Sequence, residues 1–227
     1  MSTATRRRAR FGVLDETFGS GATLLLGALI AAGAASLALR LVVSASERHG
    51  LDNVFLVLAL AAMPLDAVLL LVARNAAGRE RGGAALDWRG LAHKVTLGAA
   101  ALAIAGAFTA NVLHLGGRAP LTTIAVACSV LAMGAAVVPR AVLLGRGQFE
   151  AVAFAAIASA LARLFVALVL VASTGRHLLV AALAILVGES VACAVVRFAA
   201  TIAASPSRSE PLTIGTGELV SAFTALG

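Results

Sequence analysis

Six long runs of apolar residues, separated by short polar segments, dominate the pattern of the chain. The runs cover residues 21–43, 54–73, 95–115, 121–138, 151–172 and 178–200, and the segments between them cover residues 44–53, 74–94, 116–120, 139–150 and 173–177. A helix of about 20 mostly apolar residues crosses the hydrocarbon core of a bilayer. Because the connecting segments are short, consecutive helices must run antiparallel. The pattern predicts an all-α polytopic membrane protein with six transmembrane helices in an up-down bundle.

The two ends of the chain differ from this bundle, which we place at residues 21–203. Residues 1–20 are rich in Arg and predict a cytoplasmic or interfacial tail. Residues 204–227 begin with a polar link that contains Pro206 and Pro211, and they turn apolar again from Leu212 onward. This last stretch contains Glu218 and is too short to span a membrane. It predicts either an interfacial tail or the start of an incomplete seventh helix in the first half of a longer protein.

The composition agrees with a membrane protein. Hydrophobic residues make up 60% of the chain and charged residues 13%, whereas soluble domains average about 45–50% apolar and about 25% charged residues. So large an apolar excess excludes a soluble globular domain. It also excludes intrinsic disorder, which requires low hydrophobicity.

The positive charge follows the predicted topology. The formal net charge is +7, and cytoplasmic loops of membrane proteins collect Lys and Arg. Most cations fall in segments on one side of the predicted membrane: Arg6, Arg7, Arg8, Arg10, Arg74, Arg79, Arg81, Arg89, Lys94, Arg140, Arg146, Arg197 and Arg208. The other side holds only Arg40, Arg48, Arg118 and Arg176. The bias predicts that both termini are cytoplasmic, and it removes the reason to expect a nucleic-acid partner.

Two ionisable residues fall near the middle of consecutive runs. Arg163 lies in the fifth run and Glu189 in the sixth, so antiparallel helices place both near the bilayer centre. Charges at this depth are costly and are candidates for function. We expect the two groups to form an ion pair. The pair either lines a polar cavity that contacts a charged substrate or fixes the register of the two helices.

Asp66 and Arg40 are the other charged candidates. Asp66 follows Pro64 in the second run, and a carboxylate beside a helix-distorting proline suits either a cation site or a bond to a neighbouring helix. Arg40 lies near the outer end of the first run. It either extends to the interface or contributes to an outward-facing cavity.

The sequence shows no catalytic or cofactor motif. The GxxxxGK[ST], HExxH and GxSxG patterns are all missing, so we expect neither an enzyme nor a bound cofactor. Cys128 and Cys193 lie alone inside apolar runs, and His114 has no partner cluster. Neither a metal site nor a disulfide is expected.

A family resemblance rests on several short motifs. Residues 138–149 read Val-Pro-Arg-Ala-Val-Leu-Leu-Gly-Arg-Gly-Gln-Phe; Arg163 follows in the next apolar run, and Gly188-Glu189 in the run after it. These motifs resemble the fourth-to-fifth helix link and the next two helices of polysaccharide-biosynthesis flippases of the O-antigen type. Those flippases belong to the multidrug/oligosaccharidyl-lipid/polysaccharide exporter superfamily. Leu39-Arg40-Leu41, and Leu65-Asp66 with Arg74, resemble that family's first two helices.

The resemblance implies the N-terminal six-helix lobe of a two-lobed transporter in the bacterial cytoplasmic membrane. It implies export of lipid-linked oligosaccharide or polysaccharide precursors, with membrane lipids, the lipid-linked sugar and a second six-helix lobe as partners. The second lobe is expected to come from a missing C-terminal half or from another chain. The substrate-binding candidates are then Arg40, Asp66, Arg163 and Glu189. Two alternatives remain open: a non-transporting scaffold subunit, and a cation-coupled drug antiporter of the same superfamily.

Overall fold

The computed structural model describes residues 3–81, 85–112, 120–174, 177–203 and 209–211, with side chains at 21–77, 88–107, 120–174 and 177–203. The long helices are α1 (Thr3–Val42), α2 (Arg48–Arg81), α3 (Arg89–Val112), α4 (Pro120–Gly145), α5 (Phe149–Thr174) and α6 (Leu178–Ala203). A short 3₁₀ turn, η1 (Ala45–Glu47), precedes α2. In this part of the chain six helices are long and apolar enough to cross a membrane. The prediction of an all-α polytopic bundle is confirmed.

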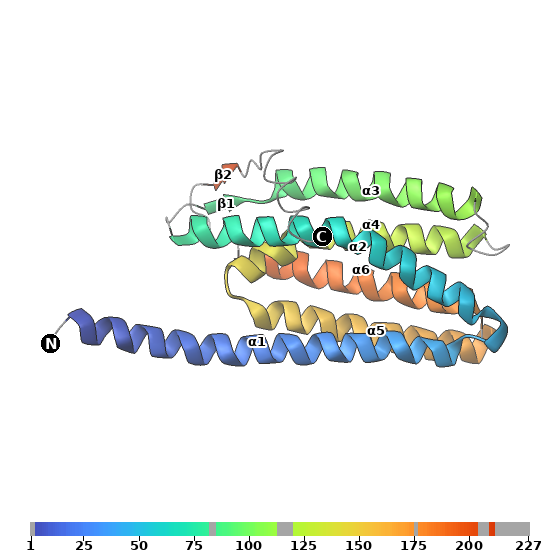
Figure 1. Ribbon diagram of the computed structural model, residues 1–227, viewed down its shortest axis with the longest axis horizontal. Helices are drawn as coiled ribbons and strands as arrows, with labels where there is room; N and C mark the ends of the chain where they lie inside the picture. Colours follow the sequence, from blue (N-terminus) through green and yellow to red (C-terminus); the bar gives the residue numbers. More distant parts are fainter. Residues whose placement is uncertain (1–2, 82–84, 113–119, 175–176, 204–208, 212–227) are drawn as a thin grey trace.

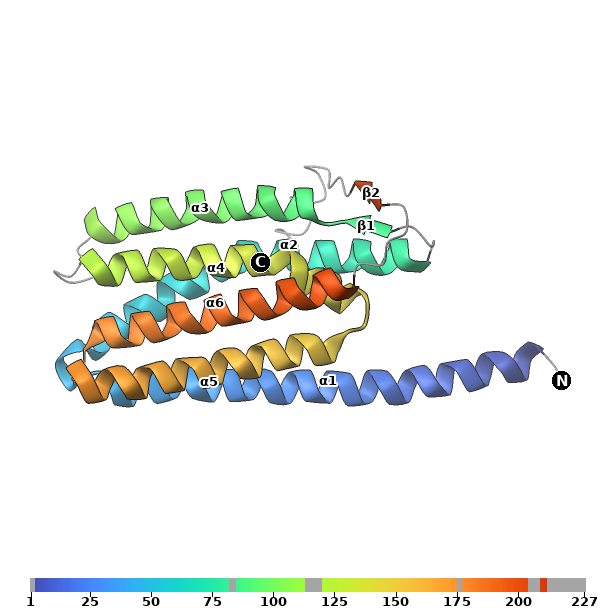
Figure 2. The same cartoon turned by 180° about the vertical axis from the view of Figure 1, so that it is seen from behind.

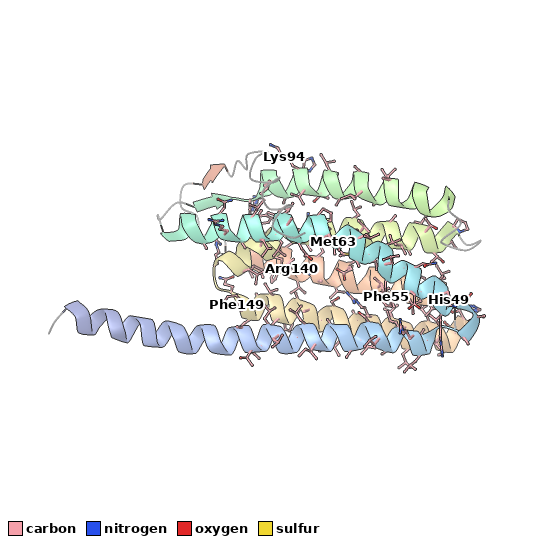
Figure 3. The ribbon with its side chains drawn as sticks, viewed as in Figure 1. His49, Phe55, Met63, Lys94, Arg140 and Phe149 are labelled. Atoms are coloured by element: carbon pink, nitrogen blue, oxygen red, sulfur yellow. The ribbon has the colours of Figure 1, made fainter. Side chains whose placement is uncertain are left out.

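The helices lie side by side in the order α3, α4, α6, α5, α1, and α2 crosses the face of this layer (Figures 1 and 2). We call the end where α2 ends and α3 begins the basic end, after Arg74 and the neighbouring cations. Lys94 lies toward the basic end and His49 at the opposite end (Figure 3). At the basic end, strand β1 (Ala85–Asp87) pairs in parallel with β2 (Ser209–Pro211). This pairing ties the segment after α6 to the α2–α3 link, and sequence patterning did not predict it.

Small residues bring the helices together, and large residues face outward. Buried positions are mostly Ala and Val, whereas Leu41, Ile104 and Leu168 are 71–72% exposed in the isolated chain. A transmembrane surface presents such side chains to lipid, and small residues let helix backbones approach closely. In contrast to a soluble protein, the bundle therefore leaves many of its large apolar side chains available to the bilayer.

The two largest apolar clusters of the described residues lie at different depths. The cluster near the basic end includes Leu143 and Val196, and the cluster near the opposite end includes Leu39 and Ile185. Along α6, Glu189 lies between Ile185 and Val196 in sequence. The structure thus places a charged residue between two apolar layers.

The clearest correction to the predicted helix boundaries concerns the end of the fourth helix. We expected the fourth helix to end at residue 138 and residues 139–150 to form a link. Instead α4 continues through Pro139 to Gly145. A transmembrane helix tolerates an internal proline because neighbouring helices re-satisfy the freed backbone groups.

The end of α4 is set by Gly147, and not by Pro139 as the sequence suggested. The φ of Gly147, 71°, lies in the left-handed region, which suits glycine. Its N–H donates to the Leu144 carbonyl at 3.0 Å, and the Gln148 N–H donates to the Leu143 carbonyl at 2.9 Å. These two bonds are the paired bonds of a Schellman motif, which satisfies the last carbonyls of a helix.

Two further predicted links, residues 44–53 and 74–94, are also shorter than expected. The second helix begins at Arg48 and runs to Arg81, so residues 44–53 and 74–94 are largely helical. Polar residues at helix ends extend into the headgroup region without breaking the helix, which hydropathy alone cannot detect. Helix α1 likewise extends back to Thr3, into the predicted tail. The expected seventh-helix start at 212–227 lies outside the described residues.

Candidate functional site

An ion pair between α5 and α6 occupies the middle of the bundle. Nη2 of Arg163 donates a hydrogen bond to Oε1 of Glu189. The two side chains are only 13% and 12% exposed. Because both residues lie near the middle of antiparallel neighbours, they share the same depth. The prediction that they pair inside the bundle is confirmed.

A third helix joins this pair through Ser36 of α1. Nη1 of Arg163 donates to the Ser36 hydroxyl at 2.9 Å. That hydroxyl donates in turn to the backbone carbonyl of Ala32 at 3.0 Å. The guanidinium therefore links α1, α5 and α6 in one hydrogen-bonded chain. We call Ser36, Arg163 and Glu189 the charged centre.

Gly188 makes room for the arginine. A Cβ at this position would lie 2.3 Å from Cγ and 2.7 Å from Nε of Arg163. The arginine side chain therefore lies directly over the α6 backbone before it reaches Glu189. The Gly-Glu dipeptide has a physical explanation: the glycine admits the guanidinium, and the glutamate neutralises it.

Two polar atoms beside this centre are buried without a hydrogen-bond partner. They are Nε of Arg163 and the hydroxyl oxygen of Ser159. Ser159 precedes Arg163 by one turn of α5, so the two share a helix face. Ser159 is only 3% exposed. Buried polar atoms are nearly always paired, so these two atoms are exceptions within the described part of the chain.

Asp66 lies toward the basic end, on the exposed side of α2. Arg140 of α4 is the cation that acts on it electrostatically. Figure 3 labels Arg140 in the region between α2 and α6. Charges thus continue from the centre toward the basic end.

Arg40 lies toward the opposite end, one helical turn beyond Ser36 on the same face of α1. Its Nη2 contacts Oδ1 of Asp52 at 2.5 Å, and the two side chains are 53% and 49% exposed. A paired, half-exposed arginine at a helix end fits the interpretation that Arg40 extends to the interface. The Arg40–Asp52 pair is therefore a polar contact between α1 and α2 at this end of the bundle.

The four predicted site residues therefore divide into three places. Arg163 and Glu189 come together, Arg40 lies toward one end, and Asp66 lies toward the other. Sequence reasoning missed Ser36, Ser159 and Arg140. Serine is common in transmembrane helices because it bonds its own backbone, so only its spacing from Arg40 could have indicated Ser36.

No metal site accompanies these charges in the described part of the chain, where no group of three His, Cys, Asp or Glu residues could hold an ion. Comparisons with family models, with curated proteins and with solved structures found no match to this chain. The geometry of the charged centre and the sequence motifs that surround it are therefore the features that bear on function.

Proposed function

We propose that this chain forms one six-helix lobe of a membrane transporter that moves an anionic, lipid-linked sugar precursor of polysaccharide. The observation that carries the proposal is the Arg163–Glu189 pair, held at mid-membrane across α1, α5 and α6. Intramembrane ionisable residues mark substrate pathways by default. The motif at residues 138–149 and the Gly188-Glu189 dipeptide add the resemblance to polysaccharide flippases.

Arginine suits this substrate class because its planar guanidinium binds phosphate oxygens through two parallel hydrogen bonds. Without substrate, Glu189 neutralises Arg163. A diphosphate that enters the centre competes with Glu189 for the guanidinium. The unpaired Nε of Arg163 and the Ser159 hydroxyl supply two more donors for its oxygens. In this exchange the guanidinium stays paired, while Glu189 loses its cation and has to take up a proton or another cation; that cost keeps the binding reversible.

A second lobe completes the proposed transporter. Alternating access in this kind of protein requires two repeats that move against each other around a shared site. The exposed position of Asp66 on α2 supports such a partner, because a carboxylate inside a span avoids lipid. In the proposed setting, the basic end faces the cytoplasm of a bacterium, in agreement with the distribution of Arg and Lys.

Asp66 also favours a second candidate, the cation-coupled antiporter. An exposed intramembrane carboxylate is suited to exchange a proton or sodium ion. Export that depends on a proton or sodium gradient, and that is lost in Asp66→Asn, would support this candidate.

Binding of a water-soluble, short-chain prenyl diphosphate sugar to the purified full chain tests the proposal. Wild-type protein should bind it, and Arg163→Gln should lose at least about tenfold in affinity, because one charge-assisted contact contributes about 1.5–3 kcal/mol. Arg48→Gln is the matched control, since it removes the same charge from an exposed position outside the centre. Equal loss in both variants would show general charge attraction and would refute the site.

A transport assay extends the test. Co-expression of the chain with a matching second lobe should restore export of lipid-linked sugar. Unchanged export in Arg163→Ala, at normal protein levels, would remove Arg163 from the site. A chain that associates with other membrane proteins but binds no diphosphate sugar would instead be the scaffold subunit.

A further inference from the structure

An apolar pocket lies apart from the charged centre, between α2, α3 and α4. Its volume is about 430 Å³. Each of the three helices contributes small or branched apolar residues to its walls, among them Val57, Leu60, Ala103, Gly106, Val126 and Ala127. None of the residues that form the charged centre lines this pocket.

The pocket exists because α2 diverges from α3. At the basic end, Val72 and Ala76 of α2 belong to one apolar cluster with Ala92 of α3 and with Trp88, which directly precedes α3. At the opposite end α2 instead meets α6, where Gly50 lies against the side chain of Leu178. Figures 1 and 2 show this diagonal course of α2. The opening between α2 and α3 therefore follows from the angle at which α2 crosses the other helices.

The polar residues of the pocket gather at one end. Asn53 lies in the first turns of α2, and Thr122 and Thr123 lie in the first turn of α4. All three are near the end of the bundle opposite the basic end, where lipid headgroups begin. The deeper walls, down to Ala61 and Val130, are apolar. The pocket is thus polar at its outer end and apolar along its length, in the same order as the headgroup and acyl chains of a membrane lipid.

The pocket is continuous with the surface that meets the bilayer. Its rim includes Leu56, Leu60 and Leu102, which are 58%, 57% and 41% exposed.

We infer that this pocket binds one acyl chain of a membrane phospholipid, with the headgroup beside Asn53, Thr122 and Thr123. The apolar walls exclude water and offer an acyl chain close contacts on three sides. The inference does not depend on the proposed transport function, since the pocket and the charged centre share no residue.

Photo-crosslinking in proteoliposomes tests the inference. Full-length protein is reconstituted with phosphatidylcholine that carries a diazirine on its acyl chain, and crosslinked peptides are mapped by mass spectrometry. The wild-type protein should concentrate crosslinks in the pocket segments of α3 and α4. Gly106→Phe should lower this yield by about tenfold, which corresponds to a loss of about 1.4 kcal/mol in binding free energy.

Gly98→Phe is the matched control. Both glycines lie on α3, and a Cβ at either meets nothing within 4 Å, so neither variant should disturb folding. Gly98 does not line the pocket. Equal crosslinking in wild type and Gly106→Phe would overturn the inference. Displacement of the phospholipid by an equimolar prenyl phosphate would overturn the choice of a phospholipid chain in favour of an isoprenoid.

A second readout protects against a misfolded variant. Phospholipid retained after extensive detergent washing should fall in Ala127→Trp, which fills the pocket from α4, and remain at the wild-type amount in Ala101→Trp, on the exposed face of α3. Retention that falls equally in both tryptophan variants would show general lipid coating and would contradict the inference.

Discussion

Arg163 and Arg40 each pair with a carboxylate, but the two pairs occupy different environments. The Arg163–Glu189 pair is nearly buried, has a third partner in Ser36 and lies between two apolar clusters. The Arg40–Asp52 pair is about half exposed and lies near the end of α1. Exposed ion pairs contribute little because water screens them. In a buried pair, removal of one partner leaves an uncompensated charge. Burial, more than the pairing itself, should therefore decide how much each pair matters.

The largest expected effect comes from breaking the buried pair. Glu189→Gln should lower the free energy of unfolding by about 3–5 kcal/mol, because it leaves Arg163 charged and unpaired. Glu189→Gln combined with Arg163→Met should be nearly neutral. Steric-trapping or detergent-unfolding measurements can compare the variants. A double variant no more stable than the single one would contradict the pairing energetics.

A smaller effect should follow from Gly188→Ala. The added methyl group would overlap Cγ and Nε of Arg163, so the arginine side chain must move. Overpacking of this kind typically costs about 1–3 kcal/mol. Gly98→Ala is the control, because its Cβ meets open space. If both alanine variants unfold at the same denaturant concentration, Arg163 does not cross α6 as described.

Ser36→Ala should have an effect of similar or smaller size. It removes the acceptor of Nη1 of Arg163, and a buried donor left without a partner costs about 1–3 kcal/mol. Ser173→Ala is the control, since Ser173 is exposed and bonds only backbone carbonyls of its own helix. Similar stability of the two variants in the same unfolding assay would show that Ser36 does not support the arginine.

The smallest effect should come from the exposed pair. Arg40→Ala should lower the free energy of unfolding by about 0.2–1 kcal/mol, and the loss should shrink as salt is added. Unfolding at low and high ionic strength measures both quantities. A loss as large as that of Glu189→Gln would remove the distinction between the two pairs.

The bundle and its central pair could be predicted from the sequence because hydropathy and helix rise fix depth. Arg163 and Glu189 lie near the middle of adjacent apolar runs, and antiparallel helices bring them to one level. Depth does not fix rotation about the helix axis, however. Whether Asp66 faced the centre or the exterior was therefore open, and the structure places it on the exposed side.

Helix ends were harder to predict than helix depth. Pro139 suggested a boundary, but the end of α4 depends on the left-handed Gly147. The 85–87 and 209–211 pairing joins segments far apart in sequence, and no periodicity indicates such a contact. The apolar pocket follows from the crossing angle of α2, which depends on packing of the whole bundle.

Thermal unfolding with a short-chain prenyl diphosphate sugar tests the central claim most directly, that Arg163 is the anion-binding group and Glu189 its competitor. We expect the ligand to raise the Tm of Glu189→Gln more than that of wild type. We also expect no shift in the Arg163→Met/Glu189→Gln double variant, whose fold is preserved. A ligand-dependent shift of the same size in the double variant would contradict the account.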